Sequence, residues 1–226
     1  MASSSSINAR CATVLTVPGL NGSGPDHWQT LWEQSRPDTA RVELGMWHTP
    51  HRNSWVTKLD QAIRRAGAPV VLAAHSLGCV AVAWWAELSP QLPDWPVVGA
   101  LLVAPADVDR AAAPSEIKGF APIPRLRLPF PSIVVASQDD PWVTLERARG
   151  LAADWGSHFV DAGARGHLNA DSGLGVWREG QELLDHVLLD SFETGRHGGG
   201  HASTRSLVAS EVRRRHDTNG RRGPVA

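Results

Sequence analysis

The chain of 226 residues has little cysteine, no tyrosine and almost no net charge. Cys11 and Cys79 are its only cysteines and both lie in apolar runs, so we expect no disulfide framework and a reducing compartment. The formal net charge of −1 gives no general attraction to nucleic acid or to an anionic membrane. No apolar run approaches the roughly 20 residues of a membrane-spanning helix. These absences predict a cytoplasmic protein that acts on neither nucleic acid nor membrane.

The two ends of the chain differ in composition from its centre. Residues 1–10 contain a run of serines without the basic and apolar regions of a secretory signal, and residues 195–226 are rich in glycine and arginine. We expect a disordered N-terminus and a disordered basic tail around one domain at residues 11–190. His197 and His201 lie in the tail, where a solvated segment is favoured over a metal site. We therefore predict no metal.

Strand and helix patterns alternate along the central region, which predicts a three-layer α/β fold with a mostly parallel sheet. The expected strands are short apolar or alternating runs at residues 13–17, 41–44, 69–73, 97–103, 132–136 and 157–160. The expected helices have apolar residues at helical spacing and lie at residues 25–35, from a cap at Asn53 or Ser54 to 65, 79–86, 144–154 and 176–189.

Residues 105–131 interrupt this alternation. The segment carries six prolines and no clear periodicity. It is too short for a lid domain, so it predicts either a small, partly ordered flap or a plain connecting loop.

The string Ala74-His75-Ser76-Leu77-Gly78 stands between a buried-strand pattern and a helix pattern. A tight strand-turn-helix bend needs small residues around its apex, and Ala74 and Gly78 meet that need. Such a bend lifts a serine hydroxyl above the sheet edge, next to the free N–H groups of a helix N-terminus. We predict that Ser76 is a nucleophile.

A serine hydroxyl is a poor nucleophile unless a general base accepts its proton, and the base needs an acid to orient it. On a strand-turn-helix nucleophile the chain order is serine, acid, histidine. Asp139 and Asp140 follow the predicted strand at 132–136, and His167 follows the last strand. Either aspartate could be the acid, while the other holds the loop or caps the next helix. We expect His75 to support the turn rather than to act as the base. Other histidines that could touch a substrate are His27, His48 and His51.

An oxyanion formed at this serine would need two N–H donors. The backbone amide of Leu77 is the first candidate. The second lies in the glycine-rich loop at residues 18–24, where Leu20 is preferred over Asn21. That loop lacks the register of a dinucleotide-binding motif. We expect Asn21 and Trp142 to line the substrate site.

Together these motifs resemble the small α/β-hydrolases typified by retinoblastoma-binding protein nine and bacterial YdeN. The shared strings are Val17-Pro18-Gly19, Trp28, His75-Ser76-Leu77-Gly78, Ala104-Pro105-Ala106-Asp107, Ser137-Gln138-Asp139-Asp140-Pro141 and Gly166-His167. The resemblance covers about residues 12–189 and implies an α/β-hydrolase fold with a minimal cap. It places the triad acid on Asp140, the residue before the proline, beside Ser76 and His167. The tail lies outside the family's pattern, and Ala74 replaces the usual first glycine of the serine motif.

The resemblance implies a serine hydrolase that needs no cofactor. We predict a carboxylesterase-like enzyme that cleaves a small acyl substrate, either an ester, a thioester or an amide, through an acyl-enzyme on Ser76. A cofactor-free perhydrolase would use the same three residues. A non-catalytic interaction protein on the same fold is the remaining alternative, although no protein partner can be named.

Overall fold

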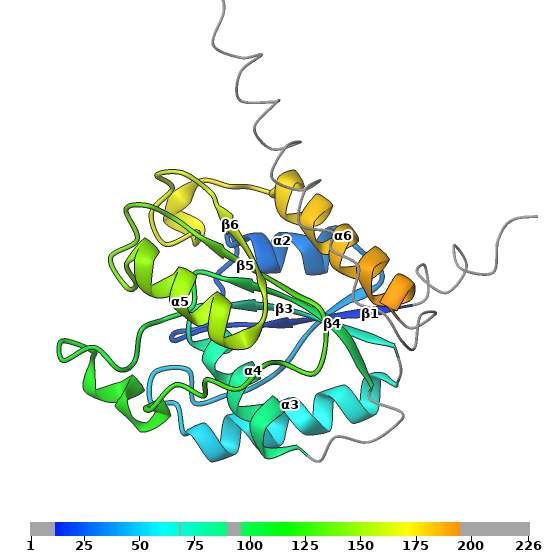
Figure 1. The fold of residues 1–226 in the computed structure, drawn as a ribbon. Helices are drawn as coiled ribbons and strands as arrows, with labels where there is room; N and C mark the ends of the chain where they lie inside the picture. The colour runs from blue at the N-terminus through cyan, green and yellow to red at the C-terminus, as the bar shows by residue number, and fades with distance from the viewer. Residues whose placement is uncertain (1–11, 68, 90–95, 195–226) are drawn as a thin grey trace, which may run out of the picture. The chain divides into compact units, whose positions relative to one another are not determined.

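The computed structural model describes residues 12–67, 69–89 and 96–194 (Figure 1). The predicted disordered ends at residues 1–10 and 195–226 lie outside the described residues, as does Cys11. The described residues form a parallel sheet with helices on both faces, as the alternating pattern predicts.

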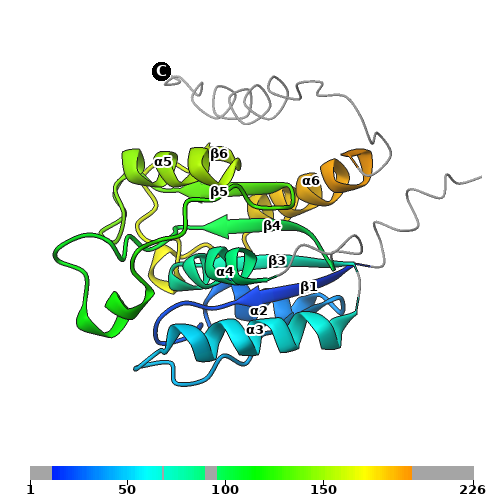
Figure 2. The same ribbon diagram turned by 60° about the horizontal axis from the view of Figure 1, so that its bottom comes forward.

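The sheet has six strands in the order β2-β1-β3-β4-β5-β6, and every neighbouring pair is parallel (Figure 2). Their bounds are β1 (Thr13–Val17), β2 (Thr39–Arg41), β3 (Val70–His75), β4 (Val97–Val103), β5 (Ser132–Ala136) and β6 (His158–Asp161). The chain leaves β1 toward β2 and returns on the other side of β1 to form β3. The strand order therefore reverses between β1 and β3, where parallel α/β sheets bind their ligands beyond the carboxyl ends of the strands.

In the part of the chain that the structure describes, five helices cover the two faces of the sheet. They are α2 (Trp28–Ser35), α3 (Arg52–Ala66), α4 (Leu77–Leu88), α5 (Leu145–Trp155) and α6 (Arg178–Thr194). In the described part of the chain, no helix is both long enough and apolar enough to cross a membrane. Side chains of α3, α4 and α5 share one buried cluster, and those of α2 and α6 share the other.

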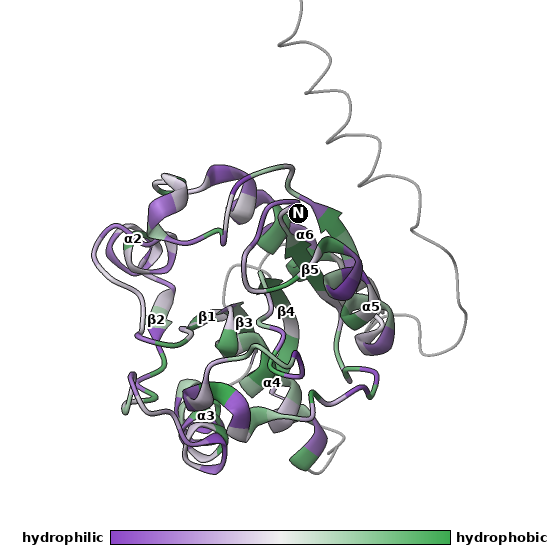
Figure 3. Cartoon of the chain, turned by 90° about the vertical axis from the view of Figure 1, so that its left-hand side faces the viewer, coloured by the Kyte–Doolittle hydropathy of each residue, from purple (hydrophilic) through white to green (hydrophobic). Residues whose placement is uncertain are grey.

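Successive residues of the central strands point to opposite faces of the sheet and so belong to these two clusters in turn. Leu72 and Ala74 belong to the α3–α4–α5 cluster, whereas Val71 and Ala73 belong to the α2–α6 cluster. β3 is buried along its whole length, and Figure 3 shows the central strands mostly in the green of apolar residues. This position, buried on both faces, explains why the strand reads as a continuous apolar run.

Two predicted boundaries near the N-terminus are wrong. α2 begins at Trp28 rather than at residue 25, because His27 is its N-cap and accepts a hydrogen bond from Gln29 N. The second strand covers residues 39–41 rather than 41–44. Its pairing with β1 stops there: Val42 N makes a last hydrogen bond to Thr16 O, whereas Leu44 N donates to Val42 O within its own segment.

Two further helix starts also differ. α3 begins at Arg52 with His51 at its N-cap, so neither Asn53 nor Ser54 caps it. α6 begins at Arg178 rather than at residue 176, because Trp177 adopts a positive φ of 37° that a right-handed helix cannot include. Both differences depend on single backbone torsions that apolar periodicity does not report.

Residues 105–131 pack against the body of the domain and contain one short 3₁₀-helix, η1 (Ser115–Phe120). Two indole N–H groups from the helices beneath the segment donate hydrogen bonds to its backbone. Trp84 of α4 donates to Phe120 O at 2.7 Å, and Trp155 of α5 donates to Pro124 O at 2.7 Å. Ile117 and Phe120 are buried in the larger core cluster. These contacts favour the predicted flap over the plain loop.

Candidate active site

Ser76 lies at the bend between β3 and α4 with φ 54° and ψ −121°, a strained conformation for a residue other than glycine. The bend is possible because Gly78 has no side chain. A Cβ on Gly78 would lie 2.2 Å from Val17 O and 2.7 Å from Pro18 O, both in the backbone of the β1 end. The first helical turn of α4 thus packs directly on the end of β1, which explains why a residue without a side chain stands at position 78.

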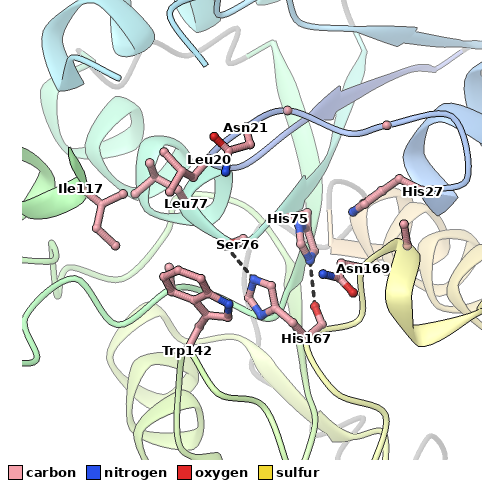
Figure 4. A pocket seen from close by; sticks show the side chains of 14 residues that line it. Leu20, Asn21, His27, His75, Ser76, Leu77, Ile117, Trp142, His167 and Asn169 are labelled. Atoms are coloured by element: carbon pink, nitrogen blue, oxygen red, sulfur yellow. Dashed lines mark hydrogen bonds between the residues drawn. The ribbon is translucent and has the colours of Figure 1, made fainter. Parts of the chain in front are cut away.

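Three of the predicted residues meet at this bend, and Figure 4 shows two of them, Ser76 and His167, joined by a hydrogen bond. Ser76 Oγ lies 2.9 Å from His167 Nε2, and His167 Nδ1 lies 2.9 Å from each carboxylate oxygen of Asp140. Because a carboxylate only accepts, Nδ1 carries the proton and Nε2 is left to accept from the Ser76 hydroxyl. The Asp140 side chain is fully buried, and its Oδ1 also accepts from Trp142 N at 2.8 Å.

Asp139 has a different set of partners. Its Oδ1 accepts from Ser137 Oγ at 2.7 Å and from Gly166 N at 2.7 Å. These hydrogen bonds, that of Ser137 first, lower the pKa of the exposed Asp139 carboxyl. Asp139 therefore ties the loop after β5 to the loop that carries His167. Of the two aspartates that the sequence left open, Asp140 is the one in contact with the histidine.

Two ring N–H groups hold the backbone around His167. The Nε2–H of His75 donates to His167 O at 2.9 Å, and the indole N–H of Trp28 donates to Leu168 O at 3.0 Å. Burial lowers the pKa of His75 well below its ordinary value, so the ring is neutral. The sequence predicts that His75 supports the turn around Ser76. In the structure, His75 also contacts the loop that carries His167.

The loop after β1 approaches the bend closely. A Cβ on Gly19 would lie 2.8 Å from Ser76 Cβ and 3.2 Å from Leu77 N. Among the described residues, the backbone N–H groups of Leu20 and Leu77 have no hydrogen-bond acceptor. Asn21 N, the second choice from the sequence, already donates to Trp47 O at 2.9 Å. Of the two donors that the sequence offered in this loop, Leu20 N is therefore the one without an acceptor among the described residues.

A cavity of about 250 Å³ opens above Ser76. Asn21 and Trp142, for which the sequence predicts a place at the substrate site, both line this cavity, and so does His27. Sequence reasoning missed Ile117 from η1 and Asn169, which precedes the 3₁₀-helix η2 (Ala170–Ser172). Neither residue stands in a periodic pattern or a motif, so only the fold reveals them.

Comparison with known proteins gives one family and several solved structures. A family model described as serine hydrolase matches residues 14–186. A protein described as a YdeN-like hydrolase from Pectobacterium atrosepticum is 29% identical with a TM-score of 0.71, over 83% of this chain and 96% of that one. The ydeN gene product of B. subtilis is 20% identical with a TM-score of 0.63, over 80% of this chain and 99% of that one.

The fold is that of the α/β-hydrolases. A hydrolase of the alpha/beta superfamily from Xanthomonas campestris is 17% identical with a TM-score of 0.51, over 81% of this chain and 99% of that one. A search of the curated proteins gave no match.

Proposed function

The chain belongs to the serine hydrolase family, and we propose that it cleaves a small ester, thioester or amide through an acyl-enzyme on Ser76. One observation carries this proposal. The hydroxyl of Ser76, the ring of His167 and the carboxylate of Asp140 form a continuous hydrogen-bonded chain. This is the arrangement that activates a serine hydroxyl for attack on an acyl carbon.

In the proposed reaction, Ser76 Oγ attacks the acyl carbon while its proton passes to His167 Nε2. Asp140 holds the ring with Nδ1–H toward the carboxylate and stabilises the imidazolium that forms. The carbonyl oxygen becomes an oxyanion and receives hydrogen bonds from the backbone N–H groups of Leu20 and Leu77. The oxyanion then collapses, the bond between the acyl carbon and the leaving group breaks, and His167 donates its proton to that group, which leaves the acyl-enzyme on Ser76. A water molecule then attacks the acyl-enzyme through the same proton transfers and releases the carboxylic acid from Ser76.

The size of the cavity supports a small substrate. A volume of about 250 Å³ is slightly below the range of roughly 300–1,000 Å³ that is usual for small-molecule sites. Ile117 of the packed flap limits one side of it. Carboxylesterase-like chemistry on short acyl groups is therefore the activity that we propose.

Labelling by a fluorophosphonate and hydrolysis of esters of graded chain length test the proposal. Replacing Ser76 with alanine should abolish labelling and lower kcat by on the order of 10⁶-fold, if the three residues act as a unit. Ser35→Ala, which changes an exposed serine at the end of α2, is the matched control and should retain both. Equal turnover by wild type and Ser76→Ala would overturn the proposal.

A further inference from the structure

The cavity above Ser76 has two halves of different chemistry. Ile117 and Trp142 line one side, where apolar and aromatic surface predominates. His27 and Asn169 line the other side, and Figure 4 shows them across Ser76 from Ile117 and Trp142. The proposed mechanism uses none of these four side chains. The polar half therefore needs its own explanation.

The contacts of His27 define which of its nitrogens carries the proton. His27 Nδ1 accepts from Gln29 N at 3.2 Å as the N-cap of α2. A nitrogen that accepts a backbone N–H carries no proton, so the neutral ring has its proton on Nε2. Burial first, and then the charge of Arg41, lower the pKa of His27 to about 4. At neutral pH this ring is thus an uncharged Nε2–H donor.

Within the described residues, that donor has no hydrogen-bond partner. His27 is only 4% exposed, and its Nε2 atom is buried. A buried polar group without a partner is costly, and native structures normally satisfy it with protein, water or ligand. Since His27 lines the cavity, a molecule bound there is the available source of an acceptor.

Asn169 supplies a second uncharged donor to the same half of the cavity. Its Oδ1 accepts from Asp171 N at 3.1 Å, which fixes the orientation of the amide. The Nδ2 group is left without an acceptor among the described residues. No aspartate, glutamate, lysine or arginine is among the described residues that line the cavity. His27 and Asn169 therefore contribute N–H donors to this half of the cavity, and no lining residue among those described carries a formal charge.

From this geometry we propose that His27 and Asn169 bind an uncharged oxygen acceptor of the substrate, such as an ether, carbonyl or hydroxyl oxygen near the scissile bond. The apolar half beside Ile117 and Trp142 then receives the hydrocarbon part. The inference rests on the proposed hydrolase function and adds to it a class of substrate: small acyl compounds that carry a second oxygen on one side of the bond to be cleaved.

This assignment can be tested with two pairs of esters. Within each pair, one ester has an oxygen where the other has a methylene group. In the first pair the acyl group changes, as in 4-nitrophenyl pentanoate and 4-nitrophenyl 3-methoxypropanoate. In the second the alcohol changes, as in butyl acetate and 2-methoxyethyl acetate. The readout is the ratio of kcat/KM within each pair, divided by the ratio for alkaline hydrolysis. This normalisation removes differences in intrinsic reactivity.

Wild type should favour the oxygen-bearing member of at least one pair by about tenfold, the size of one or two hydrogen bonds. Replacing His27 with asparagine should bring the normalised ratio close to one, because asparagine still caps α2 but has no distal ring N–H. Asn169→Ser, which keeps a capping oxygen and removes the amide nitrogen, should lower the same ratio. The matched control is His51→Asn, the same substitution at the exposed N-cap of α3, and it should keep the wild-type ratio.

Fluorophosphonate labelling of the same samples distinguishes a failure of the proposed subsite from a failure of the proposed hydrolase function. A labelled wild type that shows no oxygen preference in either pair overturns the subsite alone. A preference that survives in His27→Asn also overturns it. An unlabelled wild type that hydrolyses none of the four esters overturns the proposed function and, with it, the subsite.

Discussion

The Nε2–H of His75 donates a 2.9 Å hydrogen bond to the backbone carbonyl of His167, and the two rings lie 4.8 Å apart between centroids at 60°. His75 is the last residue of β3 and precedes Ser76 directly. The bond therefore links the strand that carries the serine to the loop that carries the histidine.

This bond predicts that His75 is a positioning residue. His75→Leu removes the donor and leaves the carbonyl of His167 without its partner, so we expect kcat to fall about tenfold to 10²-fold through a displaced ring. Stability should fall by about 1 kcal/mol. His75→Gln can place an amide N–H near the position of Nε2 and should recover most of kcat.

Steady-state kinetics of the two variants on one ester, with kcat and KM resolved, provides the measurement. A purely structural role would lower the stability of both variants without a selective loss of kcat in His75→Leu. Equal kcat in wild type and His75→Leu would contradict the prediction.

A second prediction contrasts two glycines in helices. A Cβ at Gly78 would lie 2.2 Å from Val17 O and 2.7 Å from Pro18 O, and because both atoms are backbone, no side-chain movement can relieve the clash. Gly78→Ala should cost about 3 kcal/mol or more in the free energy of unfolding. Gly150, in the exposed part of α5, has nothing within 4 Å of an added Cβ. Gly150→Ala should therefore stabilise the protein by about 0.5–1 kcal/mol.

Urea unfolding of both alanine variants compares them on one scale. Similar free energies of unfolding for Gly78→Ala and wild type would show that the end of β1 can move away from α4. The bend would then tolerate more bulk than its backbone contacts indicate.

The sequence predicts the regular elements well where packing is local and repetitive. The strands at residues 97–103 and 132–136 have their predicted bounds, because apolar runs report burial between two helical layers directly. Helix starts are predicted less well, since they depend on single torsions such as that of Trp177. Apolar periodicity carries no information on such torsions.

Some residues of the candidate site could likewise be predicted from the sequence, whereas the contacts of others could not. Ser76, Asp140 and His167 are found by motif and chain order, and the fold brings them into contact. The partners of Asp139 could not be known from the sequence, because Gly166 lies on another loop. His27 could be suspected, but its free Nε2 depends on its place as the N-cap of α2, and the sequence predicted that this helix begins at residue 25.

The lowered pKa of His27 predicts how stability depends on pH. Its ordinary pKa is 6.5 and its folded-state pKa is about 4, because burial disfavours the charged ring. Between these values the unfolded chain binds more protons than the folded chain, so stability rises with pH across the window and is lost as pH falls from 6.5 toward 4. His27 alone should account for about 2 kcal/mol of lost stability between pH 7 and pH 5.

Urea unfolding at these two pH values tests this linkage. His27→Asn should lose about 2 kcal/mol less than wild type on going to pH 5, whereas His51→Asn should lose as much as wild type. Parallel losses in all three proteins would show that His27 takes up its proton without cost in the folded state.

The last prediction concerns the two neighbouring aspartates. Asp140 accepts from His167 Nδ1 with both oxygens, so an asparagine there can present an N–H to the ring and favour the wrong tautomer. The Nε2 atom of His167 would then carry the proton and could not accept a hydrogen bond from Ser76 Oγ. A loss of roughly 10⁴-fold in kcat was the consequence of this change in a serine protease triad, and we expect a similar loss in Asp140→Asn.

Asp139→Asn is the matched control, because the two residues are adjacent and the chemical change is identical. The Oδ1 atom that receives Ser137 Oγ and Gly166 N is retained in an asparagine, so the two loops stay joined and kcat should change little. Measuring kcat/KM on one ester and the rate of fluorophosphonate labelling for both variants gives the comparison. If Asp139→Asn were the inactive enzyme, the loop connection would matter more to turnover than the contact of Asp140 with the ring. If both variants kept full activity, His167 would not need a carboxylate partner, and the tautomer argument for Asp140 would be wrong.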